Sequence, residues 1–194
     1  MTDEIIFFIG PQGSGKGTQA KLLAQRLGFF YWEMGGILRE VAAEATPLGQ
    51  TVKDMIDRGV LLEDSTLLEV ATSRLVKMSA GQGIIFDGIP RRVGQAEFLL
   101  NFLKTQDRAK FITIFIDLPR SESLKRLMLR AETEHRKDDT EETINFRLNQ
   151  YEEDTLPVLD YLRKETRFIT IDGKPLIEEV TVSINHELGL ANEG

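Results

Sequence analysis

The chain has 194 residues, of which 41% are hydrophobic, and a formal net charge of −7. This length and apolar content fit one hydrophobic core, so we expect a single domain spanning 1–194. The acidic balance argues against a broad nucleic-acid surface, and any anionic ligand should be small and bound by clustered Arg and Lys side chains. The sequence contains no cysteine, which excludes disulfides and cysteine-ligated zinc.

No apolar run approaches membrane-spanning length, and the first residues lack the basic region of a signal peptide. We therefore expect a cytoplasmic protein that binds no membrane. Nothing in the sequence demands an oligomer, and we expect a monomer.

The first predicted element is an apolar strand at 4–9, followed by a glycine-rich loop at 10–20 that leads into a helical pattern. Strand, glycine loop and helix are the context in which such a loop binds phosphate. Its backbone N–H groups converge on phosphate oxygens, the helix dipole adds positive potential, and Lys16 supplies a full charge. An ordinary glycine turn is the alternative, but it does not require four glycines and a lysine at this spacing.

Further strand-length apolar runs follow at 29–32, 83–86, 110–117 and 167–171, with helical patterns between them. Nearly continuous apolar strands are typical of a parallel sheet covered on both faces. We predict an α/β, P-loop NTPase-type three-layer fold with a five-stranded parallel sheet and helices on both faces. Two insertions are expected at the carboxyl end of the sheet, at about 34–64 and 130–139, which leaves a core of about 1–33, 65–129 and 140–194.

Charged motifs follow three of these strands, at Asp87, Asp117 and Asp172. One charged residue after a buried strand is usually a helix cap. Three around a phosphate loop favour a ligand site, because ligands of such sheets bind at the carboxyl ends of the strands.

The loop resembles that of the adenylate kinase family, which ends Gly-Lys-Gly-Thr-Gln. A generic P-loop has Ser or Thr directly after the lysine, whereas this chain has Gly17 followed by Thr18. The resemblance extends over nearly the whole chain. It includes the segment ending in Arg39, the Asp87-to-Arg91 motif, Gln95 at the family's spacing, and the later residues Arg126, Arg130, Arg136 and Arg147.

This resemblance implies reversible phosphoryl transfer, most simply ATP + AMP = 2 ADP, with Mg²⁺ as cofactor. By similarity, Asp87 orders Mg²⁺-bound water, Arg39 and Arg91 hold the acceptor phosphate, and Gln95 hydrogen-bonds the adenine edge. The implied catalytic residues are Lys16, Asp87, Arg91, Arg126, Arg130, Arg136 and Arg147. The implied ATP-binding residues are Gly13, Ser14, Gly15, Lys16, Gly17, Thr18, Arg126, Arg130 and Lys174. The implied AMP-binding residues are Met34, Arg39, Leu62, Gly88, Arg91, Gln95, Arg136 and Arg147.

These residue types suit the chemistry. Phosphoryl transfer needs cations that align two anionic nucleotides and offset transition-state charge, and arginine binds phosphate through two points without losing its charge. Each arginine alone is explained by a surface charge or an ion pair; the set at family spacing favours function. The insertions 34–64 and 130–139 would cover the site and exclude water. The second is short and lacks cysteine, so we expect no zinc.

The sequence departs from the family pattern around the acceptor site. Met34 replaces a threonine, Gly36 replaces an aspartate, Leu62-Glu63-Asp64 replaces the usual Val-Pro/Thr-Asp, and Arg92 stands where threonine is common. These changes are either neutral or alter the base preference. The alternatives are therefore a kinase for CMP, UMP or GMP, or a weakly active nucleotide-binding or sensor protein.

Overall fold

The computed structural model describes residues 4–57, 63–79, 81–134 and 140–191. Its centre is a five-stranded sheet in the order β2-β3-β1-β4-β5, in which every neighbouring pair is parallel. The strands are β1 (Ile5–Ile9), β2 (Phe30–Glu33), β3 (Ile84–Asp87), β4 (Phe111–Asp117) and β5 (Arg167–Asp172). The predicted five-stranded parallel sheet is confirmed.

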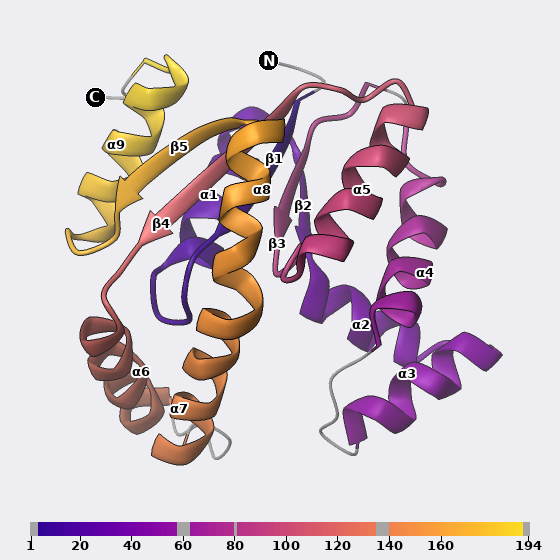
Figure 1. Ribbon diagram of the computed structural model, residues 1–194, viewed down its shortest axis with the longest axis horizontal. Helices are drawn as coiled ribbons and strands as arrows, with labels where there is room; N and C mark the ends of the chain where they lie inside the picture. The colour runs from indigo at the N-terminus through magenta and orange to yellow at the C-terminus, as the bar shows by residue number, and fades with distance from the viewer. Residues whose placement is uncertain (1–3, 58–62, 80, 135–139, 192–194) are drawn as a thin grey trace.

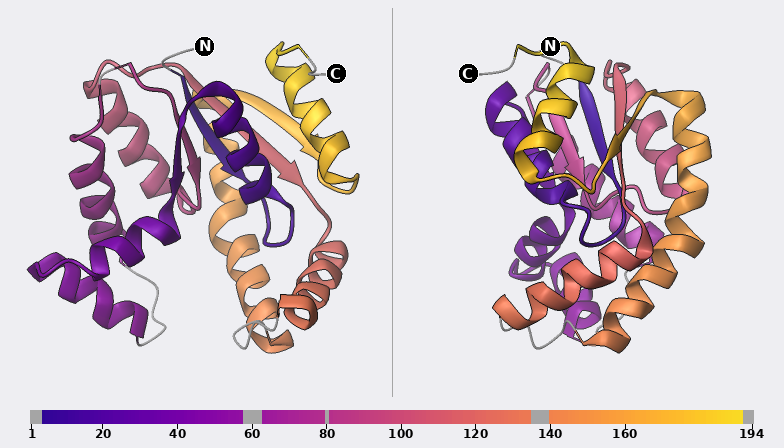
Figure 2. Two further views of the ribbon diagram at one scale, coloured as in Figure 1. Left: turned by 180° about the vertical axis from the view of Figure 1, so that it is seen from behind. Right: turned by 90° about the vertical axis from the view of Figure 1, so that its left-hand side faces the viewer.

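Helices cover both faces of this sheet, as Figures 1 and 2 show. One face packs against α1 (Lys16–Leu27) and α9 (Ile177–Leu188), and the other against α5 (Val93–Thr105) and α8 (Leu156–Glu165). The predicted three-layer α/β fold is therefore also confirmed. Within the described ranges, no helix combines the length and apolar character needed to cross a bilayer.

The central strand β1 supplies side chains to both layers. Ile5, Phe7 and Ile9 pack on the α5–α8 side, whereas Ile6 and Phe8 pack on the α1–α9 side. This alternation follows from the period of two in a strand, and burial on both faces explains why the sequence is apolar at every position. The strand thus forms the fixed base from which the glycine loop begins.

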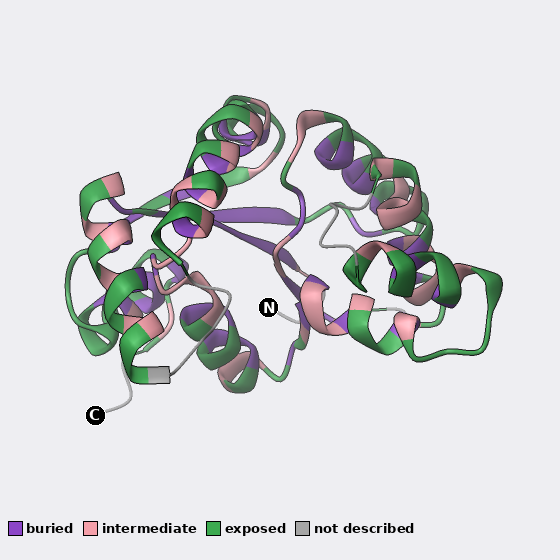
Figure 3. Cartoon of the chain, turned by 90° about the horizontal axis from the view of Figure 1, so that it is seen from below, coloured by how far each residue is buried: buried purple, intermediate pink, exposed green. Residues whose placement is uncertain are grey.

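The remaining helices form two groups, one on each side of the molecule in Figure 1. The first contains α2 (Met34–Ala42), α3 (Pro47–Asp57) and α4 (Asp64–Leu75), and the second contains α6 (Arg120–Glu134) and α7 (Glu141–Gln150). Seen from below in Figure 3, both groups carry mainly exposed and intermediate residues, in contrast to the buried strands between them.

The helix α7 continues through a π-helical segment, η1 (Tyr151–Thr155), into α8. Such wider turns occur often at functional sites because they change which side chains face inward. Here η1 buries Tyr151 and Thr155 and leaves Asp154 partly exposed. This single helical column therefore connects the α6–α7 group to the body of the sheet.

Candidate active site

The glycine loop follows directly from β1, and α1 begins at Lys16. Gly13 and Gly15 have φ of 82° and 83°, in the left-handed region that favours glycine. A Cβ on Gly13 would also lie 3.1 Å from the carbonyl oxygen of Ser123, at the base of α6. The glycines thus permit both the loop conformation and its close contact with α6.

Lys16 lies in a strongly perturbed electrostatic setting. Burial lowers the pKa of its ammonium to about 8; the Asp87 carboxylate opposes this shift, while Arg91 and Arg130 add to it. The charges of Arg91 and Arg130 are therefore close enough to Lys16 to be felt by its ammonium. This arrangement creates a strong site for a polyanion.

Asp87 ends β3 beside the start of α1. The Tyr31 hydroxyl donates to its Oδ2 at 3.0 Å, and burial together with this carboxylate raises the pKa of Tyr31. A Cβ on Gly17 would lie 3.0 Å from the same Oδ2. The glycine after the lysine thus lets the Asp87 carboxylate approach the loop closely.

This corner fits the implied Mg²⁺. The described residues contain no cluster of three or more His, Cys, Asp or Glu that could hold a metal alone. Mg²⁺ commonly keeps several waters and binds through one or two carboxylates plus substrate phosphates. Asp87, beside the phosphate loop, supplies one such carboxylate.

Three neighbouring pockets surround the loop. The first, here called the P-loop pocket, has a volume of about 360 Å³ and is lined by Gly13, Gly15, Lys16, Gly17, Thr18, Asp87, Arg126, Leu127 and Arg130. It collects most of the predicted ATP-binding residues. Ser14 lies buried within the loop itself.

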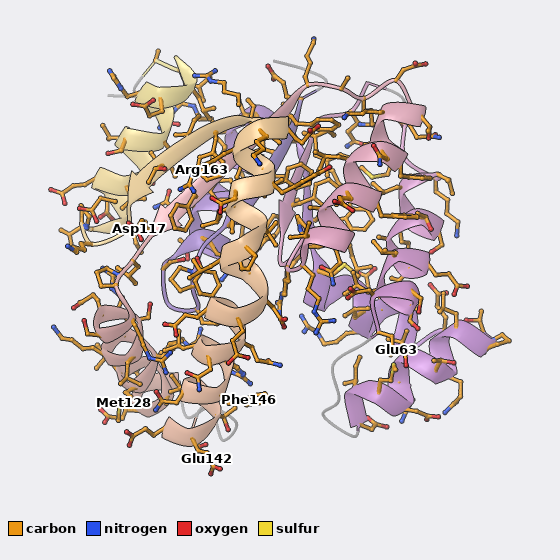
Figure 4. All side chains as sticks on the ribbon, viewed as in Figure 1. Glu63, Asp117, Met128, Glu142, Phe146 and Arg163 are labelled. Carbon is orange, nitrogen blue, oxygen red and sulfur yellow. The ribbon has the colours of Figure 1, made fainter. Side chains whose placement is uncertain are left out.

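Lys174 is connected to this pocket through its backbone. The Arg126 guanidinium donates to the carbonyl oxygens of Gly173 and Lys174 at 2.9 and 2.8 Å, and so ties α6 to the loop after β5. That loop is anchored in turn at the end of β4, where the Gly173 N–H donates to the Asp117 carbonyl. Figure 4 labels Asp117 at this carboxyl end of β4.

The second pocket, here called the arginine pocket, has a volume of about 180 Å³. Met34 and Leu38 of α2 and Leu67 of α4 give it an apolar side, whereas Arg91 and Arg147 bring cations from the loop before α5 and from α7. The other lining residues are Gln12, Gly35, Gly88, Arg92, Gln95, Gln150, Tyr151, Asp154 and Thr155. An apolar side and a cationic side together suit a base joined to a phosphate.

The third, here called the central pocket, lies between the other two. Its lining includes Lys16, which also faces the P-loop pocket, and Arg91, which also faces the arginine pocket. Gln12, Gly88, Tyr151 and Thr155 line both the central and the arginine pockets. The two larger pockets therefore meet at a hollow bordered by a lysine and an arginine.

Arg39, another predicted site residue, lines none of these three pockets. Its guanidinium pairs with Glu33 at 3.2 Å, with both side chains well exposed, and it is not among the described residues lining the arginine pocket. A Cβ on Gly36 would lie 3.3 Å from the Glu33 carboxylate, so this pair lies against the glycine. The predictions for Leu62 and Arg136 lie outside the described residues.

The sequence reasoning missed several residues of the arginine pocket. Asp64 and Asp154 received no role, and Arg92 was noted only as a departure from a pattern. In the structure Arg92 pairs with Asp64 at 3.1 Å and with Asp154 at 3.4 Å. The unusual arginine was the available signal, but its partners lie far along the chain.

Fold and site together define a P-loop protein of the three-layer α/β class with two cation-lined pockets that meet beside the loop lysine. The family model described as "Adenylate kinase" matches residues 8–167. Among curated proteins, an adenylate kinase of Thermus thermophilus is 38% identical over 187 residues, covering 96% of this chain and 98% of that protein. An adenylate kinase of a Cyanothece species is 39% identical over 181 residues, 93% of each chain.

A more distant adenylate kinase, from Phocaeicola vulgatus, is 34% identical and covers 92% of this chain and 95% of its own length. The chain belongs to the adenylate kinase family and is an enzyme, a nucleoside monophosphate kinase, which transfers a phosphoryl group between nucleotides.

Proposed function

We propose that this enzyme catalyses ATP + AMP = 2 ADP, with ATP in the P-loop pocket and AMP in the arginine pocket. One observation carries the proposal: Lys16 and Arg91, which face different large pockets, both line the central pocket between them. A γ-phosphoryl group bound near Lys16 and an acceptor phosphate bound near Arg91 would meet there.

In this proposal the protein acts mainly by positioning and by charge. The glycine loop and Lys16 hold the ATP phosphates, and Arg126 and Arg130 add cations from α6. Arg91 and Arg147 hold the acceptor phosphate in line with the γ-phosphorus. An acceptor phosphate oxygen forms the new bond while the bond to the leaving ADP oxygen breaks, and the cations offset the charge that spreads over the transferred group. We propose that Arg136 joins this set.

Asp87 would hold the Mg²⁺ of the bound nucleotide, through water. When bound, the ion would neutralise phosphate charge and orient the nucleotide. Tyr31 contributes by holding the Asp87 carboxylate in position through the hydrogen bond to Oδ2. Removing Mg²⁺ with EDTA should therefore abolish turnover, and adding it back should restore it.

The residues proposed for AMP are those of the arginine pocket. Met34, with Leu38 and Leu67, would pack on the base, and Gln95 would hydrogen-bond the edge of the base. Gly88 would line the pocket between the base and the phosphate. The ion pair of Arg39 with Glu33 is exposed and worth little, so Arg39 can leave it for a phosphate when the nucleotide binds. We also propose that Leu62 contacts the base, and that the segments 34–64 and 130–139 cover the bound nucleotides. Cytoplasmic location and a monomeric state stay predictions.

A coupled assay of ADP formation tests this proposal. We expect ADP to form from ATP and Mg²⁺ only when AMP is present, and kcat/KM to be higher for AMP than for CMP, UMP or GMP. Preference for another monophosphate would move the acceptor assignment to that nucleotide. ADP formation that is equally slow with every monophosphate would instead support the nucleotide-binding or sensor alternative.

A further inference from the structure

Gln95 lies at the centre of a hydrogen-bond network on the wall of the arginine pocket. Its Nε2 donates to Asp64 Oδ1 at 2.7 Å, and its Oε1 accepts from the Arg91 backbone N–H at 2.8 Å. A carboxylate only accepts and a backbone N–H only donates, so these two partners fix which end of the amide points each way. The side chain is 4% exposed, which leaves it little freedom to rearrange.

Arg92 holds the carboxylate on which this orientation depends. Its Nη1 donates to the same Asp64 Oδ1 at 3.1 Å, and its Nη2 donates to Asp154 Oδ2 at 3.4 Å. Asp64 is the first residue of α4 and Asp154 belongs to η1, so one guanidinium joins two walls of the pocket. Partial burial lowers the pKa of Arg92, but both carboxylates raise it and the net shift is upward, so it stays charged.

The fixed amide has a consequence for base recognition. One N–H and one lone pair of Gln95 remain for a ligand in the pocket. Adenine presents an amino donor beside a ring-nitrogen acceptor, which this amide matches. Hypoxanthine presents a carbonyl acceptor beside an N–H donor, and a glutamine matches that pattern only by exchanging its oxygen and nitrogen. An amide free to turn over would accept both bases, whereas a fixed amide rejects one.

We propose that Arg92 is a positioning residue for base specificity: through Asp64 it keeps the Gln95 amide in the orientation that favours a 6-aminopurine over a 6-oxopurine monophosphate. This inference rests on the proposed binding of the acceptor in the arginine pocket. It also gives a role to the arginine that departs from the family pattern. Arg92 lines the pocket, yet it acts on the base through another side chain.

The test is equilibrium binding of AMP and IMP, measured by calorimetry on the full-length wild type and on variants. Wild type should prefer AMP. Arg92→Ala should lower the AMP-to-IMP preference about five- to tenfold, the scale for one ordinary hydrogen bond, mainly by tightening IMP binding. Arg92→Lys should restore part of the preference, because an ammonium can pair with Asp64 but does not reproduce the guanidinium fork.

Two further variants separate positioning from general stability. Asp64→Ala, which removes the direct partner of the amide, should lower the preference at least as far as Arg92→Ala does. Lys104→Ala removes an ion pair at the other end of α5, to Glu165 of α8 at 3.3 Å, and is the matched control. It should leave the preference unchanged even if its melting temperature falls as much as that of Arg92→Ala.

Arg92→Ala with an unchanged AMP-to-IMP preference would overturn the inference while leaving the proposed reaction intact. A wild type that does not discriminate AMP from IMP would also overturn it. In that case the coupled assay of phosphoryl transfer, measured separately, decides whether the proposed reaction still holds. A loss of the AMP-to-IMP preference in Arg92→Ala that Lys104→Ala does not share would support the inference that Arg92 is a positioning residue.

Discussion

The P-loop pocket takes most of its groups from residues 13–18, with Asp87 and the middle of α6 beside them, whereas the arginine pocket draws on segments from Gln12 to Thr155. In the first, geometry comes from glycine backbone and a helix start, and little of it depends on distant side chains. In the second, orientation depends on pairs such as Arg92 with Asp154. Binding of a triphosphate can therefore be encoded locally, while choice of a base requires side chains brought together by the fold.

The largest expected effect lies on the P-loop side. Lys16→Gln removes the charge that both the P-loop and central pockets share, and we expect kcat to fall by about 10³-fold or more, the scale for a cation acting on the transferred phosphoryl group. Steady-state kinetics with both nucleotides saturating measures this. Lys21→Gln, an exposed lysine of the same helix, is the control and should turn over normally.

The next largest effect should appear in the arginine pocket. Arg91→Ala should lower kcat/KM for the monophosphate by about 10²-fold, the loss seen on removing one group that stabilises developing charge. KM for ATP should change much less. Arg163→Ala is the matched control, because Arg163 lies on α8, where Figure 4 labels it, and there it pairs with Asp160 and stacks over Phe168 of β5. Equal losses for both nucleotides would show that the two pockets are not separable.

A smaller effect should appear in the pH dependence of ATP binding. In the free enzyme the pKa of Lys16 is lowered to about 8, and a bound triphosphate should raise it again. Below pH 8 the lysine is already charged. Above it, binding must take up a proton, so affinity should fall by up to about tenfold per pH unit.

Calorimetry in two buffers of different ionisation heat measures that proton uptake. AMP binding in the arginine pocket serves as the internal comparison and should depend less on pH over this range. Binding of ATP that is flat from pH 7 to 10 would contradict the assignment of the titrating group to Lys16.

The smallest effect concerns Gly17. In Gly17→Ala the new methyl would stand 3.0 Å from Asp87 Oδ2, so the carboxylate must shift by a few tenths of an ångström. A cost of about 1 kcal/mol, typical of mild overpacking, corresponds to about fivefold in kcat. The loss should grow at low Mg²⁺, since Asp87 is the group displaced, and a Mg²⁺ titration of turnover checks this.

The sequence alone predicted the features that depend on local patterns. The strand expected at 4–9 is observed at Ile5–Ile9, and the one expected at 110–117 is observed at Phe111–Asp117. A continuous apolar run predicts such a strand well, because it is stable where both faces of the strand are buried. The glycine loop was equally clear, since its φ values near +80° require glycine.

What could not be predicted depends on distant partners. Arg92 looked like an isolated change from threonine, and nothing local indicates that α4 and η1 bring Asp64 and Asp154 to it. The phosphate role of Arg39 stays a prediction, and the motif that suggested it did not indicate the ion pair with Glu33. The π-helical turn of η1 was also missed, because its composition differs little from that of an α-helix.

The most direct test of the whole account follows one phosphoryl group. The enzyme is mixed with Mg²⁺, AMP and ATP labelled at the γ-phosphate, and the products are separated after a single turnover. If the two pockets meet at the central pocket as proposed, the label appears in the β-phosphate of newly formed ADP. Label released as inorganic phosphate at a rate independent of AMP would contradict direct transfer between the pockets.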